Sequence, residues 1–216
     1  MKVKVTPSKV HGNVKIPASK SMAHRALICA SLSDGTSIVS NVTNTKDIEA
    51  TVGCMKALGA NIKQIDETTY EVTGTNLFKQ EGNITCNANE SGSTLRFLIP
   101  LAACTNAKVK FLGHGRLLQR PMDVYENEFK KQNIEFNQSD KEIIVHGNLQ
   151  AKDYVVQGDI SSQFITGFMF VLPLLNQDST LTISEPYESK SYVNLTIQML
   201  AKFGIEIIET SSNSYL

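Results

Sequence analysis

The segment IPASKSMAHRAL, residues 16–27, places strongly polar side chains directly ahead of the apolar run ALICA. Its polar members are Lys20, Ser21, His24 and Arg25. At the start of a helix the first N–H groups have no partner within the helix and the helix dipole is positive, so an anion is favoured there. The segment therefore predicts either a plainly capped helix start or a binding site for an anion.

Two more segments open in the same way, and the three starts are 70 residues apart. Ser21 opens SMAHRALICASL, Ser91 opens SGSTLRFLIPLAAC, and Ser161 opens SSQFITGFMFVLPLL. Each segment is followed by a short strand-like run, an amphipathic helix and two more short strands. A repeat of this kind predicts three similar structural units within one domain.

The opening helix of each unit is apolar nearly all round, so it must be buried, while the second helix keeps a polar face. We therefore expect an α/β (α+β) domain of three pseudo-symmetric β-α-β-α-β-β units, with buried parallel helices in the middle and sheets outside. The starts of the buried helices then converge. The third unit ends in SSNSYL, where the first two carry the full strands ETTYEVTG and DKEIIVHG, so we expect a chain cut inside its last strand.

Cations accompany the three polar starts. They are Lys20, Arg25, Arg96 and Lys190, joined by Arg116 and Arg120 in the loop GHGRLLQRP. A serine at one helix start is most simply an N-cap, and a charged loop is most simply solvated. Three matched starts with cations favour an anion site instead, since arginine is suited to a two-pronged grip on phosphate or carboxylate.

Composition limits the other classes of function. The chain has 216 residues with 21 basic and 21 acidic side chains, so no overall field attracts nucleic acid or an anionic membrane. The longest apolar run, residues 164–175, is too short to span a bilayer, and the start MKVKVTPS lacks a signal peptide core. We expect a cytoplasmic protein that binds neither nucleic acid nor membrane.

The cysteines predict buried free thiols. They are Cys29, Cys54, Cys86 and Cys104, and none has CxxC or Cys/His spacing. We therefore expect no metal site and no disulfide.

Five segments together resemble the successive signatures of the 5-enolpyruvylshikimate-3-phosphate (EPSP) synthase family. They are IPASKSMAHRALICASL, NESGSTLRFLIPLA, GRLLQRPMDV, GDISSQFITGFMF and ESKSYVNLTIQML. The resemblance implies an inside-out α/β barrel (α/β prism) of the enolpyruvyl transferase type. It also implies an enzyme, 3-phosphoshikimate 1-carboxyvinyltransferase, which transfers the enolpyruvyl group of phosphoenolpyruvate to the 5-hydroxyl of shikimate 3-phosphate and releases phosphate. No cofactor is implied.

The resemblance also implies a division into domains. Members of the family have two threefold domains that close on the substrates, and this chain matches only the first. Residues 15–216 would form that domain, with repeats starting near residues 21, 91 and 161. Residues 1–14 would be an N-terminal strand segment that belongs with the missing C-terminal domain, a partner that the chain would need for activity.

The site residues carried over from the resemblance fall into three groups. Shikimate 3-phosphate would be bound by Lys20, Ser21, Arg25, Ser161, Ser162, Gln163, Ser189 and Tyr192. Phosphoenolpyruvate would be received by Lys20, Gly92, Arg120 and Gln163. Asp47 and Arg96 match positions near the site, and Lys20 would face both substrates as the catalytic residue. Glu90 stands where the family more often has Asn, which leaves the detail of the Gly92 contact open.

The chemistry explains both the cations and what is missing. Each phosphate brings about −1.5 to −2 charges near neutral pH, so two phosphorylated substrates need many cations. The reaction also needs a placed acid and base. These motifs supply no convincing pair of carboxylates and only Lys20 as a proton carrier, so we expect the isolated chain to be inactive.

Three alternatives remain open. A UDP-N-acetylglucosamine enolpyruvyl transferase resembles this fold, but it places a cysteine in the loop occupied by GHGRLLQRP and an asparagine at the position of Ser21. A non-catalytic anion-binding module would need a third unit that closes its sheet. A structural or interaction protein, in which Ser and Arg only cap helices, would show no saturable binding of shikimate 3-phosphate.

Overall fold

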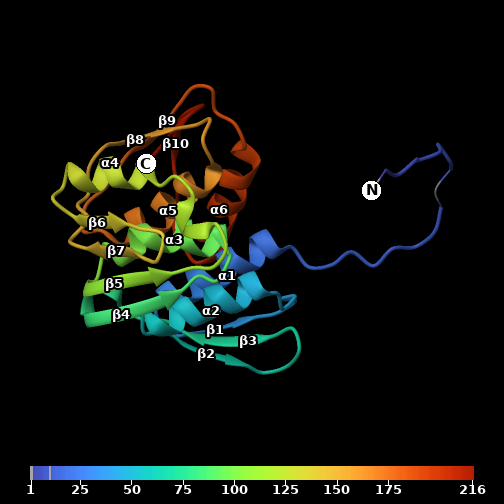
Figure 1. Ribbon diagram of the computed structural model, residues 1–216, viewed down its shortest axis with the longest axis horizontal. Coiled ribbons are helices and arrows are strands. Elements are labelled where there is room, and N and C mark those ends of the chain that lie inside the picture. The colour runs from blue at the N-terminus through green and yellow to red at the C-terminus, as the bar shows by residue number, and fades with distance from the viewer. Residues whose placement is uncertain (1, 10) are drawn as a thin grey trace.

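The computed structural model describes residues 2–9 and 11–216 (Figure 1). Within residues 2–18 the described part contains no helix or strand, and in Figure 1 this segment runs away from the folded body. The predicted N-terminal strand segment, residues 1–14, includes two residues outside the described part, residues 1 and 10. Its assignment to a second domain stays a prediction.

The folded body consists of three successive units. The first contains α1 (Lys20–Leu32), β1 (Thr36–Val39), α2 (Lys46–Ala57), β2 (Asn61–Gln64) and β3 (Tyr70–Thr73). The second, after the 3-10 turn η1 (Leu77–Lys79), contains β4 (Glu81–Asn87), α3 (Gly92–Ala102), β5 (Asn106–Leu112), η2 (Leu117–Gln119), α4 (Asp123–Lys130), β6 (Glu135–Gln138) and β7 (Ile143–His146). The third contains β8 (Tyr154–Gln157), α5 (Ser162–Val171), η3 (Leu172–Leu174), β9 (Leu181–Ser184), α6 (Lys190–Lys202), β10 (Glu209–Ser211) and β11 (Ser214–Tyr215).

Each unit contributes one sheet, and the strand orders correspond. They are β1-β3-β2, β4-β5-β7-β6 and β8-β9-β11-β10. In the second and third units a leading strand pairs in parallel with the strand that follows the buried helix, as in β4 with β5 and β8 with β9. The first sheet has no such leading strand in the described residues, so β1 is paired on one side only. The expected β-α-β-α-β-β order therefore holds for units two and three.

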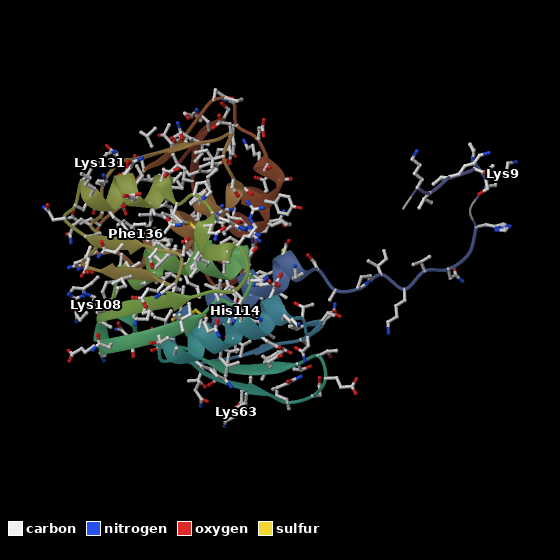
Figure 2. The ribbon with its side chains drawn as sticks, in the orientation of Figure 1. Lys9, Lys63, Lys108, His114, Lys131 and Phe136 are labelled. Carbon is white, nitrogen blue, oxygen red and sulfur yellow. The ribbon has the colours of Figure 1, made fainter. Side chains whose placement is uncertain are left out.

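The three opening helices α1, α3 and α5 lie in the middle, and the three sheets lie outside them (Figure 1). In α5 every residue from Phe164 to Val171 is buried, and α3 is buried in the same way from Leu95 to Ala102 apart from Arg96. The outer faces of the sheets carry charged side chains such as Lys63 and Lys108 (Figure 2). Helices without a wet face thus form the centre, as the sequence predicts.

Serine N-caps begin all three buried helices. The hydroxyl of Ser19 accepts from the backbone N–H of Met22, and that of Ser91 accepts from Thr94. Ser161 accepts from Gln163. The first cap is therefore Ser19 rather than Ser21, because the sequence Ser-Lys-Ser offers two caps and the helix uses the earlier one. Ser21 lies inside the first turn of α1.

Tyr125 of α4 packs at the contact between helices α3 and α5. Pro100 has no N–H, so the carbonyl of Arg96 in α3 lacks its helical donor. The fully buried Tyr125 hydroxyl replaces that donor at 2.6 Å. A Cβ atom on Gly167 of α5 would lie 2.2 Å from the Tyr125 oxygen and 2.7 Å from the Arg96 carbonyl oxygen. Proline, tyrosine and glycine from three helices thus form one junction.

All four cysteines are buried free thiols, as predicted. Burial raises the pKa of Cys29 and of Cys104 to about 12, so both stay protonated near neutral pH. In the part of the chain that the structure describes, no helix is both long enough and apolar enough to cross a bilayer. The same residues contain no group of three His, Cys, Asp or Glu side chains placed to hold a metal ion.

Candidate anion-binding site

The starts of α3 and α5 lie side by side at one end of the buried helices. The amide of Gln163 in α5 donates to the Ser93 hydroxyl of α3 at 2.9 Å. Its oxygen accepts from Nη1 of Arg96, also at 2.9 Å. Since the first turns of two helices meet here, their unpaired N–H groups and dipoles act on the same region.

Lys20 brings the start of α1 to this end. Its ammonium forms an ion pair with Asp47 in the first turn of α2, at 2.5 Å. The hydroxyl oxygen of Thr94 in α3 lies 3.3 Å from the backbone carbonyl oxygen of Asp47, so the starts of three helices are in contact. The Lys20 side chain is still 51% exposed, which leaves its other donors accessible to a ligand.

Gly92 and Arg120 are brought together, although 28 residues separate them in sequence. A Cβ atom on Gly92 would lie 2.5 Å from Nη1 of Arg120 and 3.9 Å from the Gln163 side-chain oxygen. Because glycine has no Cβ atom, the Arg120 guanidinium can lie against the start of α3. Both positions were predicted to receive phosphoenolpyruvate.

Arg96 adds a second guanidinium to the same corner. Its cation lies 4.8 Å from the centre of the Phe164 ring, and its Nε is buried without a hydrogen-bond partner in the described residues. Burial lowers the pKa of Arg96, and the charge of Arg120 lowers this pKa further. The nearby Arg120 charge thus makes the charged form of Arg96 less favourable, and a bound anion would offset that cost.

The serines of the third unit lie at the start of α5 and on the loop that leads to α6. Ser161 and Ser162 begin α5 and are partly exposed. The loop that ends at Ser189 runs beside them, because the N–H of Glu188 donates to the carbonyl of Gly158 at 3.2 Å. Ser189 has left-handed backbone with φ of 58°, and its side chain makes no capping bond to α6.

Arg25 lies inside the protein, in contrast to Lys20. It is 3% exposed and donates to the Thr196 hydroxyl at 2.8 Å, the Ser21 carbonyl at 2.8 Å and the Tyr192 carbonyl at 3.0 Å. Burial lowers its pKa to about 10. Arg25 thus ties α1 to α6 directly below Tyr192, whose side chain is exposed. Its predicted contact with shikimate 3-phosphate stays a prediction.

A buried polar chain behind the site was not predicted from the sequence. Nδ1 of His24 hydrogen-bonds the Thr51 hydroxyl, which bonds the Thr94 hydroxyl, which in turn donates to the Ser91 hydroxyl, each at 2.7 Å. Burial lowers the pKa of His24 to about 4, so the imidazole is neutral near pH 7. The chain links α1, α2 and the cap of α3. Threonines on buried helix faces are the only sequence signal for it.

Glu90 faces the loop that carries Arg116 and Arg120. A Cβ atom on Gly115, where φ is +59°, would lie 2.7 Å from the Glu90 carboxylate. The N–H of His114 in the same loop donates to the carbonyl of Asn89 at 2.6 Å. The loop is therefore held against the residues that precede α3, and the acid points toward the loop glycine.

A family model described as EPSP synthase (3-phosphoshikimate 1-carboxyvinyltransferase) matches residues 5–216. The chain belongs to the EPSP synthase family. Curated relatives agree with this assignment. The 3-phosphoshikimate 1-carboxyvinyltransferase of Clostridium perfringens strain SM101 is 45% identical over 217 residues, which is all of this chain and 51% of that protein. The enzyme of Clostridium kluyveri is also 45% identical, over 99% of this chain and 50% of that protein.

The fold agrees as well. The structure of EPSP synthase from Acinetobacter baumannii superposes with a TM-score of 0.78 at 19% identity, over 94% of this chain and 46% of that chain. At this identity the likeness shows the fold alone, and it confirms the predicted enolpyruvyl transferase domain. The chain spans about half the length of the curated relatives that it matches.

Proposed function

We propose that this chain is the shikimate 3-phosphate-binding half of a 3-phosphoshikimate 1-carboxyvinyltransferase that works in the cytoplasm. The observation that carries the proposal is the gathering of cations and helix starts at one end of the domain. Arg120 lies against Gly92, Arg96 bonds Gln163, and Lys20 projects beside them. Phosphate esters are the ligands that suit this combination of helix N-termini and guanidiniums.

Phosphoenolpyruvate is assigned to the corner between α3 and the loop of Arg120. There Gly92 permits close approach to backbone N–H groups, while Arg120, Lys20 and Gln163 offer donors. Arg96 holds the Gln163 oxygen at 2.9 Å, which turns the Gln163 amide toward Ser93 and fixes its orientation. In this proposal Arg96 acts by positioning Gln163 and by adding charge.

Shikimate 3-phosphate is assigned to the start of α5 and the neighbouring loop. Its phosphate would be bound by Ser161, Ser162 and Ser189. The Ser189 hydroxyl makes no capping bond to α6, and its left-handed backbone lies on the loop beside Gly158. Tyr192 would cover the ring, supported from below by the Arg25 guanidinium that bonds its carbonyl.

The remaining contacts to shikimate 3-phosphate come from α1. Ser21 would offer its hydroxyl and Arg25 its charge, while Lys20 would face both substrates as the proton carrier. Asp47 holds the Lys20 ammonium near the start of α2. A general acid and base are needed, and within the described residues Asp47 is the one carboxylate paired with Lys20, so the second domain would supply the acidic partner.

The proposed division into domains has support in the sheets. Residues 15–216 would be the first domain, and residues 1–14 would pack with the second. The second and third sheets each have a parallel leading strand, whereas β1 is paired on one side only in the described residues. A free strand edge in an otherwise complete threefold body is a place for a strand from elsewhere in the full protein.

The test is phosphate release from both substrates. The purified chain alone should release none above background, because the cleft lacks its second wall and water is not excluded. Addition of a separately made second half should restore turnover. Substantial turnover by the chain alone would contradict the division of labour, and failure of the chain to bind shikimate 3-phosphate at all would contradict the assigned function.

A further inference from the structure

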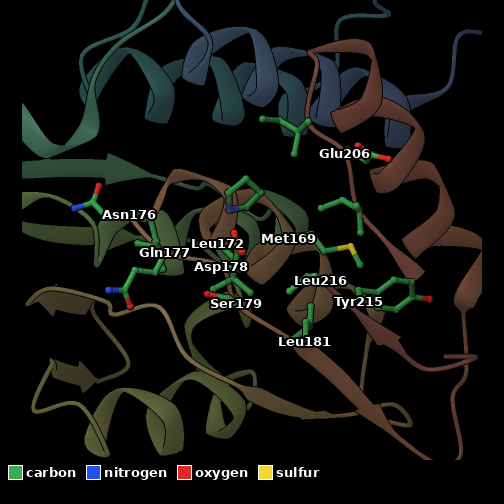
Figure 3. Close-up of a pocket in the computed structure, with 14 residues that line it drawn as sticks. Met169, Leu172, Asn176, Gln177, Asp178, Ser179, Leu181, Glu206, Tyr215 and Leu216 are labelled. Atoms are coloured by element: carbon green, nitrogen blue, oxygen red, sulfur yellow. The ribbon is translucent and has the colours of Figure 1, made fainter. Parts of the chain in front are cut away.

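A pocket at the C-terminal end of α5 takes no part in the site described above (Figure 3). It has a volume of about 220 Å³ and lies at the opposite end of the helix from Ser161. Its apolar walls are formed by Met169, Leu172, Leu181, Ile205, Ile207 and Tyr215. A single water occupies about 30 Å³, so the pocket has room for a side chain.

The first two units fill the corresponding place with their own chain. After β3, the N–H of Thr75 donates to the carbonyl of Ser31 near the end of α1, at 2.9 Å, and Leu77 is 2% exposed. After β7, the N–H of Leu149 donates to the carbonyl of Ala103 at the end of α3, at 2.8 Å, and Leu149 is also 2% exposed. In both units a buried leucine just beyond the last strand of the unit lies at the end of the buried helix.

The strand registers locate the same place in the third unit. Val109 pairs with Val145 in the second sheet, and Leu181 pairs with Tyr215 in the third. All four side chains are buried. Tyr215 therefore corresponds to Val145, and Leu216 to His146. In the second unit the next residues are Gly147, Asn148 and the buried Leu149, and it is their counterpart that would lie over the end of α5.

We propose that this pocket seats one aliphatic side chain, a leucine, carried by an extended peptide segment that continues from β11. The chain spans about half the length of its relatives, which leaves the other half of such a protein to supply the segment. Leu216, the last residue, lines the pocket, so a segment that follows it would start at the pocket wall. The proposal is independent of the assigned function, because the pocket touches none of the residues given to the substrates.

The polar rim of the pocket fits a backbone rather than a charged ligand. The Ser179 hydroxyl is buried without a partner in the described residues, so it can bond a backbone group of the incoming segment. The carboxylates of Asp178 and Glu206 stand at the exposed edge and disfavour an acidic occupant. A leucine on an extended segment would contact the apolar walls with its side chain and bond the unpartnered hydroxyl with its backbone.

The experiment extends the chain by four residues after Leu216. One variant carries Gly-Asn-Leu-Gln, the residues that follow His146 in the second unit, and its matched control carries Gly-Asn-Ser-Gln. The leucine extension should raise the midpoint of thermal unfolding by about 2–4 °C over the control. It should also shift the methyl signal of Met169, and both effects should be independent of protein concentration.

Equal unfolding midpoints for the two extensions, with an unchanged Met169 methyl signal, would overturn the proposal. So would a shift of the Met169 signal in the unextended chain that grows with protein concentration, because the occupant would then be a second copy. Both extensions start from an exposed terminus and leave the folded residues unchanged, so both variants should fold. No substrate enters the measurement, and failure of the assigned function would not affect its outcome.

Discussion

Lys20 at the start of α1 and Arg120 beside the start of α3 are exposed, whereas neighbouring polar side chains of α1, α3 and α4 are enclosed. His24 is 1% exposed, Thr94 and Tyr125 are fully buried, and each has a protein partner at 2.7 Å or less. The first region keeps charge available for a ligand. The second uses its hydrogen bonds to hold the helices in place. Substitutions in the first region should therefore weaken binding or turnover with little loss of stability, whereas substitutions in the second should lower the free energy of unfolding.

The largest effect should come from Lys20→Ala, measured as phosphate release after addition of the second half. Turnover should fall by about 10³-fold or more, because Lys20 would serve both as cation and as proton carrier. Stability should change by at most about 1 kcal/mol, since the ion pair with Asp47 is exposed. Lys63→Ala removes another exposed, paired lysine and is the matched control. Full turnover in Lys20→Ala would break the comparison.

The next largest effect should be Gly167→Ala in the enclosed region. A Cβ atom there would lie 2.2 Å from the Tyr125 oxygen and 2.7 Å from the Arg96 carbonyl oxygen. Overpacking of this kind should lower the free energy of unfolding by about 3 kcal/mol, measured by denaturant titration.

The control is Gly53→Ala, in α2, where a Cβ atom would meet nothing within 4 Å. That variant should be more stable by about 0.5–1 kcal/mol, because alanine favours the helix over glycine. Equal stability of the two variants would show that the junction of α3, α4 and α5 is looser than its distances indicate.

A smaller effect should appear as pH dependence from His24. Burial lowers its pKa to about 4, with Asp47 raising the value and Lys20 and Arg25 lowering it. Between the folded pKa and the ordinary value near 6.5 the unfolded state binds more protons, so stability falls as pH falls through this window. From pH 7 to pH 5 the loss due to His24 should be about 2 kcal/mol. The measurement is the free energy of unfolding at both pH values in the parent and in His24→Gln. An identical pH dependence in the two proteins would contradict the buried neutral imidazole.

The smallest effect should be Tyr125→Phe, which removes one hydroxyl and keeps the ring. The Arg96 carbonyl would then lose the donor that replaces the missing N–H of Pro100, at a cost of about 1–2 kcal/mol in the free energy of unfolding. Tyr192→Phe is the matched control, because that side chain is 48% exposed. Its stability should equal that of the parent. A Tyr125→Phe protein as stable as the parent would mean that water or a backbone shift satisfies the carbonyl.

The architecture could be predicted from the sequence because its signals are local. The helices that begin near Ser21, Ser91 and Ser161 are apolar on all sides, and only a central position satisfies such helices. Helix α1 begins at Lys20, next to the predicted Ser21, and its cap is Ser19 because Ser19 and Ser21 are equally good caps. In the described residues the first sheet lacks a leading strand, which the threefold pattern alone does not indicate, whereas the resemblance assigns residues 1–14 to the second domain.

The candidate site was predictable in its charge and less so in its geometry. Cations at matched helix starts are visible in the sequence, but the contact of Gly92 with Arg120 depends on how a loop folds back. Arg25 has the same sequence setting as Lys20, yet it is buried by Thr166 and Thr196, which lie 141 and 171 residues away. Contacts between residues so far apart in sequence leave no local pattern. For the same reason the hydrogen-bonded side chains that link His24 to Ser91 were not predicted.

The most direct test of the assigned function is a titration of shikimate 3-phosphate into the purified chain, followed by the backbone amide signals. The account predicts saturable binding in which Ser161, Ser162, Gln163 and Ser189 shift first and most. Ser161→Ala should weaken the binding and leave the melting temperature within a few degrees of the parent. Saturable shifts confined to other surfaces, or no saturation at all, would contradict the claim that the helix starts form a site for the phosphorylated substrate.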